Sequence, residues 1–500
     1  MVFGSGIGIG GLASGIDTNS IIQKLVQLES IPIAQIEAKK TAQKNKLNGV
    51  SQLQGLIKTL QAKAKAVSTQ ADFLVFDVHA SQDGVASFTA SGSAQAAAHT
   101  LTVNQLAVVD RWAFDGVADS AANLATGSGE TVSFTVNGTS YDVAIDEASS
   151  SLENIASAIN TEAGEDVSAT VVNTGTANSP SYKMVLTSKH SGEDGRVSDL
   201  TSTVGGLTID GTGPDGDGAA QSANNITVGL NSIAVVDGLT IERSTNEFTD
   251  VIEGVTFTVQ SADPAKQINF TTEPNKSAIK TKVQELVDAY NAVISFVNQQ
   301  NTYNKETGAG GVLFGDSLLS SVRSSIHSAL FDVPLDTVIN DTEGYATLSV
   351  LGITTQSDGT LLVDSTKLDE KLAGNLAAFA DLFVDKDGFD NGSAEVNTPE
   401  YYTDTTADSG LAASLVRSID RMMKLAAGSD GTAIKGLFDA RNQTLNEQIR
   451  SYDEDIRKKQ TYVDKFESDL ILKFARLEET MGRLNSVGAG FAAALAGLPR

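Results

Sequence analysis

The C-terminal part of the chain repeats an apolar residue at every seventh position, and this feature constrains the fold most. The repeated residues are Ile449, Ile456, Val463, Leu470, Leu477 and Leu484. A strict seven-residue repeat over about six heptads predicts a long helix that is buried along a narrow stripe. The second seam position is apolar only in part. It is occupied by Leu445, Tyr452 and Phe466, but also by the polar Lys459, Lys473 and Thr480. The helix is therefore expected to stay incompletely covered until another surface packs on it.

The N-terminal region carries a similar pattern. Asp17 or Thr18 is placed to cap a helix, which Pro32 is expected to interrupt or restart. Spacings of three and four residues then alternate through a heptad seam formed by Val50, Leu53, Ile57, Leu60, Ala64 and Val67. Both ends of the chain are thus predicted to be amphipathic helices. If the two ends pack together, the middle of the chain forms separate domains.

The middle of the chain is predicted to be rich in β-strands. Two runs of alternating apolar residues, 132–136 and 141–145, flank an Asn137-Gly138 turn, which is a strong hairpin signal. Residues 151–160 read as one short amphipathic helix, and the glycine- and aspartate-rich residues 202–220 read as a linker. Further strands are expected near 101–106, 226–228, 233–236, 239–241, 255–259 and 268–270.

From about residue 277 the apolar residues again recur every three to four positions, as in a helix. Four helices are expected, at about 279–297, 319–330, 368–382 and 411–422, with a small hairpin over 351–364. After Asn485 the sequence is small, apolar and interrupted by glycine, so a flexible tail is expected there, as it is for residues 1–15. The whole pattern predicts a multidomain α+β fold with paired N- and C-terminal helices.

Charge and composition exclude several classes of function. The formal net charge is -26, which disfavours nucleic acid as a partner, although residues 1–70 hold eight lysines against three acidic residues. Those lysines alternate with apolar residues at helical spacing, so we interpret them as a solvated helix face. The chain has no cysteine, and no apolar run is long enough to span a bilayer. The N-terminus also lacks the pattern of a cleaved signal peptide.

No catalytic, cofactor-binding or metal-binding constellation is recognisable. The four histidines, His79, His99, His190 and His327, fall on different expected elements. Two acidic stretches, 385–392 and 213–218, are interpreted as solvated loops, because the first departs from the EF-hand pattern and the second is a single short turn. The glycine-rich start lacks the flanking strand and Lys-Ser/Thr of a phosphate loop. We therefore expect a protein that is not an enzyme and binds no cofactor.

Several short sequence boxes stand out along the chain. The N-terminal box GLASGIDT contains Gly11, Ser14, Gly15 and Asp17, and a lysine-rich helix follows it. A second box, LFGDS, contains Phe314, Gly315 and Asp316. Further boxes are YNAVISFVN at 290–298, LGITTQSDGTL at 351–361, KLDEKL at 367–372 and FARLEETM at 474–481. In kind and order these boxes resemble flagellar filament capping proteins, a family also called flagellar hook-associated protein 2, and SLENIASAIN resembles an internal repeat motif of flagellins and hook-associated proteins.

The resemblance implies a specific domain organisation. The paired chain ends form a coiled-coil leg, a helical bundle domain flanks it, and two β-rich head domains form a plate. The expected domains are 1–45 as disordered tip and leg helix, 46–75 with 273–436 as helical body, 76–110 with 222–272 as β-rich domain, 111–221 as outer β-rich domain, and 437–500 as C-terminal leg and tail. Phe491, Leu495 and Leu498 are candidate contacts with the filament or an export chaperone.

The resemblance also implies a role outside the cell, at the distal tip of the flagellum. There a ring-like homo-oligomer helps exported flagellin to insert and fold, and prevents its loss. The implied partners are further copies of the chain, flagellin, the hook–filament junction proteins, and the export chaperone and export apparatus, with no nucleic acid and no membrane insertion. A secondary role in adhesion is compatible with the outer domain. The alternatives are another axial flagellar protein, such as flagellin or a junction protein, and a secreted adhesin or glycan-active enzyme.

Overall fold

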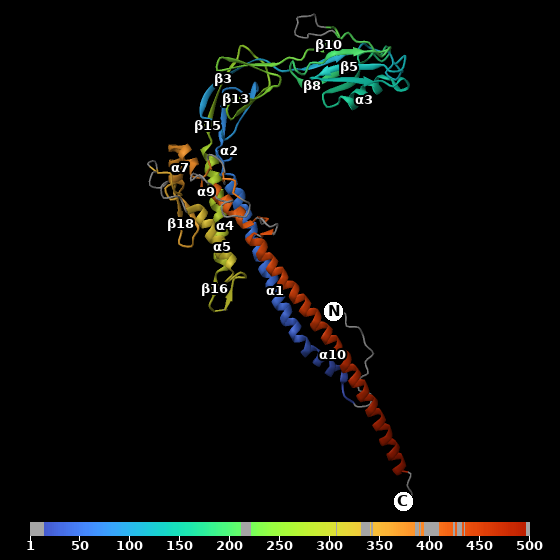
Figure 1. The fold of residues 1–500 in the computed structure, drawn as a ribbon, viewed down its shortest axis with the longest axis vertical. Helices are drawn as coiled ribbons and strands as arrows, with labels where there is room; N and C mark the ends of the chain where they lie inside the picture. The colour runs from blue at the N-terminus through green and yellow to red at the C-terminus, as the bar shows by residue number, and fades with distance from the viewer. Residues whose placement is uncertain are drawn as a thin grey trace. The chain divides into compact units, whose positions relative to one another are not determined.

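The structure is a computed structural model with two compact units. It describes residues 15–211, 222–306, 308–331, 341, 344–385, 390, 392–394, 410–423, 426–427, 433–434 and 436–496. Residues 70–279 form one unit, which is rich in β-strands, and the segments on either side of them form the other, which is mainly helical (Figure 1). The multidomain α+β class expected from the sequence is therefore confirmed, including its long N- and C-terminal helices.

Two long helices dominate the helical unit. Helix α1 spans Thr18–Lys65 and helix α10 spans Leu437–Ala496, so at about 1.5 Å per residue they measure roughly 70 and 90 Å. The two helices run side by side in opposite directions (Figure 1), and Lys40 of α1 forms an ion pair with Asp453 of α10. The chain ends thus pair as the heptad patterns predicted.

Shorter elements pack around the upper part of this pair. They are α4 (Lys276–Gln300), α5 (Ser317–Phe331), α7 (Ser365–Gly374), α8 (Leu376–Asp381) and α9 (Leu411–Met423). Three small hairpins join them: β16 with β17 (Tyr303–Asn304, Ala309–Gly310), β18 with β19 (Ile353–Thr355, Leu361–Val363), and β20 with β21 (Ala426–Ala427, Ala433–Ile434). The expected helices at 279–297, 319–330 and 411–422 and the hairpin at 351–364 are confirmed.

Two helix predictions were wrong in detail. Pro32 lies inside α1 and does not interrupt it. The carbonyl that Pro32 leaves without a donor belongs to Leu28, whose side chain is exposed, so water can satisfy it. The single helix expected at 368–382 is two helices, because Asn375 adopts an extended conformation (φ −122°, ψ 96°) and its side chain caps α8 by accepting from Ala378 N at 3.1 Å.

The first and last strands of the β-rich unit form two sheets. A five-stranded antiparallel sheet has the order β1-β15-β3-β11-β12, and a three-stranded sheet has the order β13-β14-β2. The strands are β1 (Phe76–Ala80), β2 (Ala86–Ala90), β3 (Ala97–Gln105), β11 (Ser232–Val236), β12 (Leu239–Arg243), β13 (Glu247–Ile252), β14 (Val255–Val259) and β15 (Gln267–Pro274), preceded by the short helix α2 (Gln70–Phe73). Buried Phe248, Phe257 and Phe270 fill the core of this part.

The central part of the unit has its own core around Trp112. One sheet has the order β10-β4-β8-β7 and the other β6-β5-β9. The strands are β4 (Val109–Ala113), β5 (Thr131–Val136), β6 (Thr139–Ala144), β7 (Val167–Asn173), β8 (Tyr182–Ser191), β9 (Ser198–Ser202) and β10 (Asn225–Thr227), with helices η1 (Glu147–Ser149) and α3 (Leu152–Glu162). The hairpin predicted at Asn137-Gly138 is confirmed, and both turn residues have positive φ (47° and 76°), as a type I′ turn requires.

The outer β-rich domain differs from its expected extent. Strand β10 pairs with β4, so a segment beyond the expected boundary at residue 221 belongs to the sheet of this domain. The described part of the expected linker also packs into the core, because Val204 and Leu207 are buried there. The rest of that linker, including residues 213–218, lies outside the described residues. The apolar side chains, and not the surrounding glycines, determine where this segment packs.

A buried carboxylate joins four segments of the outer domain. Asp110 on β4 is only 1% exposed and accepts hydrogen bonds from Trp112 Nε1 (2.6 Å), Val197 N (3.0 Å), Asn225 Nδ2 (3.1 Å) and Gly229 N (3.0 Å). A buried charge is tolerated when hydrogen bonds satisfy it fully. Asp110 therefore connects β4 to β10 and to the loops at residues 197 and 229.

A second, more exposed carboxylate links three segments of the same domain. Asp166 accepts a 2.5 Å hydrogen bond from Tyr141 Oη and lies 2.7 Å from His190 Nε2. The hydrogen bond from Tyr141, followed by that from His190, holds the pKa of Asp166 below its ordinary value. The same contact raises the pKa of Tyr141.

We expect Asp166 to make the outer domain sensitive to acid. Because its folded-state pKa lies below the unfolded value, its contribution is present above the ordinary aspartate pKa of about 4 and is lost as the pH falls further. Asp166→Asn should lower the melting temperature at pH 7 and flatten its decline between pH 5 and 3. Thermal unfolding of both proteins across this range tests the expectation, with the exposed Asp142→Asn as the control. Equal slopes for the wild type and Asp166→Asn would contradict it.

Candidate assembly surfaces

The described part of the N-terminal box starts helix α1. Gly15 has a positive φ of 74°, and the Asp17 side chain accepts a 3.1 Å hydrogen bond from Ser20 N. An aspartate at this position satisfies a free backbone N–H and complements the helix dipole. Gly11 and Ser14 lie outside the described residues. For Gly15 and Asp17, the structure gives a local role at the start of the helix.

The LFGDS box forms a turn that contacts both long helices. Leu313 is buried against Gly49 of α1, where an added Cβ would lie 3.2 Å from Leu313 Cγ. Asp316, 4% exposed at its side chain, accepts hydrogen bonds from Arg441 of α10, from Nε at 3.0 Å and Nη2 at 2.6 Å. Gly315 has a φ of 75°, which favours glycine. Phe314, by contrast, is half exposed.

Val50, Leu53, Ile57 and Leu60, the expected N-terminal seam of the leg, lie in the segment 46–75 that the expected domain division assigns to the helical body. All four are fully buried. This stretch of α1 packs within the body: the nearby Gln61 donates to Asp420 of α9 at 2.7 Å, and Lys63 pairs with Glu285 of α4 at 2.8 Å. These four residues therefore stabilise the body. The part of α1 that pairs with α10 alone lies closer to the N-terminus.

The C-terminal seam is covered along only part of its length. Val463 is buried and Ile449, Ile456 and Leu470 are partly buried, whereas Leu477 and Leu484 are 42% and 60% exposed. The Lys40–Asp453 ion pair marks how the two antiparallel helices are aligned. Thr18, the first residue of α1, lies 22 residues before Lys40, so it is level with Ala475, which lies 22 residues after Asp453. Helix α10 therefore extends beyond the start of α1 by about 30 Å.

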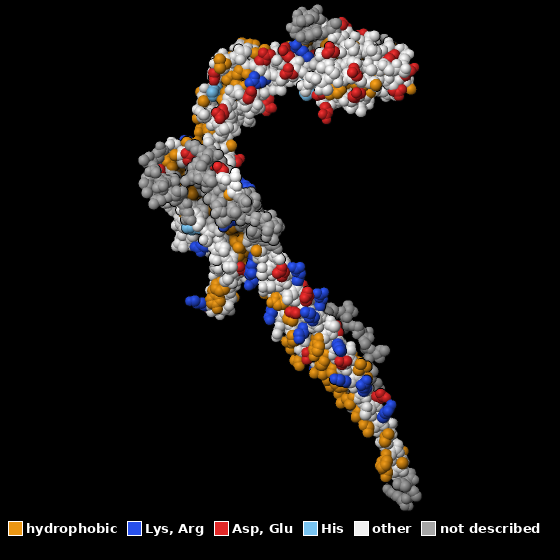
Figure 2. Space-filling view, in the orientation of Figure 1, with side chains coloured by type: hydrophobic (Ala, Val, Ile, Leu, Met, Phe, Trp, Pro, Cys, Tyr) orange, Lys and Arg blue, Asp and Glu red, His pale blue; other side chains and the backbone are white. Residues whose placement is uncertain are grey.

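The flexible tail expected after Asn485 is helical as far as it is described. Helix α10 continues through Gly488 and Gly490 to Ala496. Phe491 continues the seven-residue repeat of Leu477 and Leu484, and it is 69% exposed, while Leu495 is also exposed. Leu498 lies outside the described residues. We call this exposed row of Leu477, Leu484, Phe491 and Leu495 the apolar stripe; apolar side chains are visible along this end of the chain in Figure 2.

Further apolar side chains are exposed where α1 and α10 run together. On α1 they are Ile21, Leu28 and Ile31, and on α10 they are Tyr462, Ile471 and Leu472. Exposed apolar side chains that gather on one element are typical of surfaces that bind another protein. We refer to the paired parts of α1 and α10, which lie within the expected leg segments 1–45 and 437–500, as the leg.

Limited proteolysis should detect the uncovered end of α10. An isolated helix end without a packing partner frays, so Arg476 and Arg483 should be among the first trypsin sites to be cut. Arg441, which is held by Asp316, serves as the internal comparison and should resist. Mass spectrometry of the early fragments measures both. Early cleavage after Arg441 with an intact C-terminus would contradict this account.

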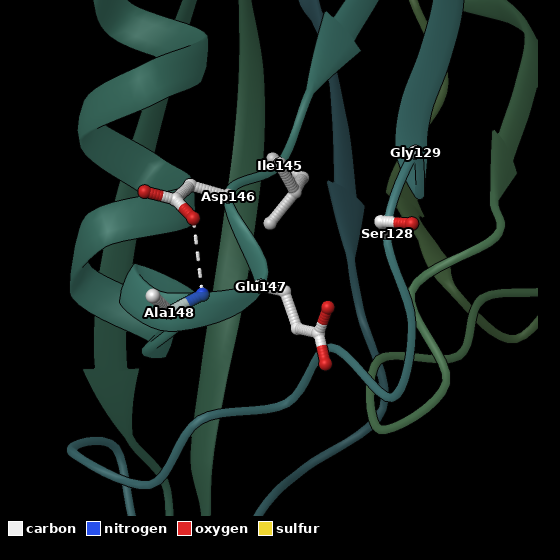
Figure 3. A pocket seen from close by; sticks show the side chains of 6 residues that line it. All are labelled: Ser128, Gly129, Ile145, Asp146, Glu147 and Ala148. Atoms are coloured by element: carbon white, nitrogen blue, oxygen red, sulfur yellow. Dashed lines mark hydrogen bonds between the residues drawn. The ribbon is translucent and has the colours of Figure 1, made fainter.

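The remaining candidate sites do not form a recognisable chemical centre. A hollow of about 540 Å³ in the outer domain is lined by Ser128, Gly129, Ile145, Asp146, Glu147 and Ala148 (Figure 3). There the Asp146 carboxylate accepts from Ala148 N at 3.0 Å and so caps η1. Asp385 pairs with Arg417 at 3.0 Å. Within the described ranges, no group of three or more acidic or histidine residues is arranged to hold a metal ion.

Three of the four histidines make separate local contacts. His99 lies 2.7 Å from Asp237, His190 lies beside Asp166, and the His327 ring lies 4.7 Å from that of Phe331. No helix in the described part of the chain has both the length and the apolar character needed to cross a membrane. The exposed apolar side chains of the leg, its apolar stripe and the turn at the LFGDS box are the surfaces of this chain suited to association.

Paired terminal helices, with a β-rich middle inserted between them, define a multidomain protein whose chain ends associate and leave apolar surface uncovered. Two family models match this chain: the C-terminal region of flagellar hook-associated protein 2 over residues 229–486, and its N-terminal region over residues 14–110. The chain therefore belongs to the flagellar hook-associated protein 2 family.

Individual relatives resemble nearly the whole chain. The B-type flagellar hook-associated protein 2 of Pseudomonas aeruginosa strain PAO1 is 29% identical, covering 95% of this chain and 92% of the relative. Flagellar hook-associated protein 2 of Escherichia coli K12 is 26% identical, covering 96% of each. The crystal structure of the D1-D2-D3 domains of the Escherichia coli flagellar cap protein FliD has the same fold, with a TM-score of 0.61 and 22% identity over 80% of this chain and 99% of that one.

Proposed function

We propose that this protein caps the bacterial flagellar filament, promoting the insertion and folding of exported flagellin and preventing its loss. The observation that carries the proposal is the apolar stripe, which continues the seam of α10 for about 30 Å beyond the start of α1. A helix that exposes Leu477, Leu484 and Phe491 in register is suited to bind a further surface. In a chain of this family, the tip of the filament offers such a surface.

The proposed mechanism is mechanical and uses no cofactor. Several copies form a ring on the filament tip, and their legs contact the filament subunits or the junction proteins below. The ring leaves an opening where one flagellin subunit folds, and then it shifts to the next position. Lys459, Lys473 and Thr480 keep the seam of the leg incomplete, which suits a contact that has to form, break and form again.

The domain organisation fits this role. In our proposal, residues 1–45 and 437–500 form the leg, 46–75 with 273–436 form the body, and the β-rich residues between them form the head. Before export, the C-terminal helix is the natural contact for a chaperone, because its uncovered apolar side chains invite aggregation. The distal tip of the flagellum is the proposed location.

Native mass spectrometry at rising protein concentration tests the proposal. A cap has to close on itself, so we expect one defined oligomer whose mass stops increasing at high concentration. A flagellin-like protein polymerises without limit, and a junction protein or adhesin need not form a ring. Open-ended growth, or a monomer at every concentration, would contradict a capping role.

A further inference from the structure

The hairpin formed by β16 and β17 exposes an apolar cluster in the helical unit. Tyr303, Val312 and Phe314 are 50%, 45% and 49% exposed, and the rings of Tyr303 and Phe314 lie 5.6 Å apart with an interplanar angle of 33°. Two large aromatic side chains that lie against each other in contact with water are a common feature of protein-binding sites. We call these three residues the aromatic knob.

The structure holds the aromatic knob in a fixed position. Leu313, between Val312 and Phe314, is buried against Gly49 of α1, and Leu313 N donates to Gln300 Oε1 at 3.2 Å. Two residues beyond Phe314, Asp316 is held by Arg441 of α10. These contacts tie the turn to both long helices. A side chain that is already held in place loses little conformational entropy on binding, so it can contribute strongly to affinity.

Close packing within the hairpin supports the same conclusion. A Cβ added to Gly310 would lie 2.8 Å from Phe314 Cγ, so glycine lets the backbone of β17 approach the ring. Gly311 N also donates to Thr302 O at 3.2 Å, which closes the base of the hairpin. Phe314 thus has half of its surface packed on its own hairpin and the other half available to a partner.

The charges near the aromatic knob indicate which partner would fit. Lys305 is exposed in the same hairpin beside the exposed Glu306, and Lys44 and Lys39, exposed on α1 a few turns before Gly49, make the surroundings positive on balance. Helix α1 as a whole carries eight lysines and two glutamates. In the part of the chain that the structure describes, no ion pair involves Lys305, Lys44 or Lys39. A partner surface that is apolar and bordered by carboxylates therefore complements both the apolar knob and the lysines around it.

The exposed residues of α1 suggest an elongated partner. Ile31 lies 18 residues before Gly49 on α1, about 27 Å along the helix, and Leu28 lies one turn further. A partner that contacts both the aromatic knob and these residues has to extend along the leg. A helix, or a pair of helices, that runs beside α1 has the required form.

We propose that the aromatic knob docks on an apolar helical surface of the filament subunit that is bordered by acidic side chains. This inference rests on the proposed capping function and specifies the chemistry of one of its contacts. Tyr303 and Phe314 enter the apolar surface, while Lys305 and the lysines of α1 face the carboxylates. Since charge pairs at the rim of a contact weaken with salt, the association should be salt-dependent.

The test uses the full-length protein and short, uncapped filaments reassembled from purified flagellin of the same bacterium. Labelled wild-type protein, Tyr303→Ala/Phe314→Ala and the control Leu362→Ala are sedimented with these filaments at low and high salt. Leu362 is a suitable control because it is a similarly exposed apolar side chain in another hairpin of the same unit. Circular dichroism and light scattering check the folding and oligomer size of each protein.

We expect the double variant to bind filament ends about tenfold more weakly or worse, and the control to stay within about twofold of the wild type. Wild-type binding should also weaken between about 50 and 300 mM salt. Unchanged binding by the double variant would overturn the inference and leave the capping proposal intact. A smaller oligomer would overturn it too, by assigning the knob to a contact between copies. Failure of the wild type to bind filament ends would count against both proposals.

Discussion

A chain that ends at Leu484 is expected to fold and form oligomers normally, but to leave cells with few or short filaments and with flagellin in the medium. From Asn485 to Leu495 every side chain is exposed, so their removal takes no packing from the body. Phe491 and Leu495 gain burial only when another surface covers them, and each is then worth about 1.5–3 kcal/mol before ordering costs. Without them the leg binds too weakly to keep the cap in place.

The measurement is a motility assay combined with a blot for secreted flagellin, in a strain whose own copy of this gene is deleted. Phe491→Ala/Leu495→Ala should reproduce most of the defect while keeping the helix, since alanine favours helix formation. Leu239→Ala, which removes an exposed leucine from the β-rich unit, provides the matched control and should swim normally. Normal filaments with no flagellin in the medium would show that the end of α10 is dispensable.

Replacing Asp110 with asparagine is expected to destabilise the outer β-rich domain by about 3–5 kcal/mol. The carboxylate accepts four hydrogen bonds with two oxygens, and an amide can offer only one oxygen while its NH2 group faces other donors. Buried donors are then left without an acceptor, among them Trp112 Nε1 or Gly229 N. The size and shape of the side chain hardly change, so the loss reports the hydrogen bonds.

Trp112 makes this measurement specific. It is the only tryptophan of the chain and lies beside Asp110, so its fluorescence during urea unfolding follows the outer domain alone. That separation matters because a multidomain protein need not unfold in a single step. Asp142→Asn, at an exposed position on β6, is the control. A midpoint shift no larger than that of the control would show that Asp110 does not hold the domain together.

Elements whose signals are local could be predicted from the sequence. The seven-residue repeat, the Asn137-Gly138 turn and the helix at 151–160 each depend on residues that are close in sequence, and the structure has each of them. The strands β1, β2, β4, β7, β8, β9 and β13 were missed. Several of them are short or carry no regular alternation, as in β7, where burial fades towards its exposed end. Their pairing partners, and not their own residues, make them strands.

The candidate surface could be predicted only in part. The seam of α10 could be predicted from its heptads, yet nothing local indicated that Leu477 and Leu484 stay exposed. The LFGDS box was recognised as a motif, but its division into buried Leu313 and exposed Phe314 depends on Gly49, more than 260 residues away. The aromatic knob was missed for the same reason, since Tyr303 and Phe314 become neighbours only through the hairpin.

The sequence by itself determined the kinds of elements in this protein and their order: two amphipathic helices at the ends, strands in the middle and a family of known assembly proteins. These follow from apolar period and turn chemistry, which act over a few residues. Only the tertiary structure decided that α1 continues through Pro32, and that Leu477, Leu484, Phe491 and Leu495 of α10 stay exposed. Those outcomes depend on contacts such as Lys40 with Asp453 and Asp316 with Arg441, because which face of a helix is buried is decided by the partner that reaches it.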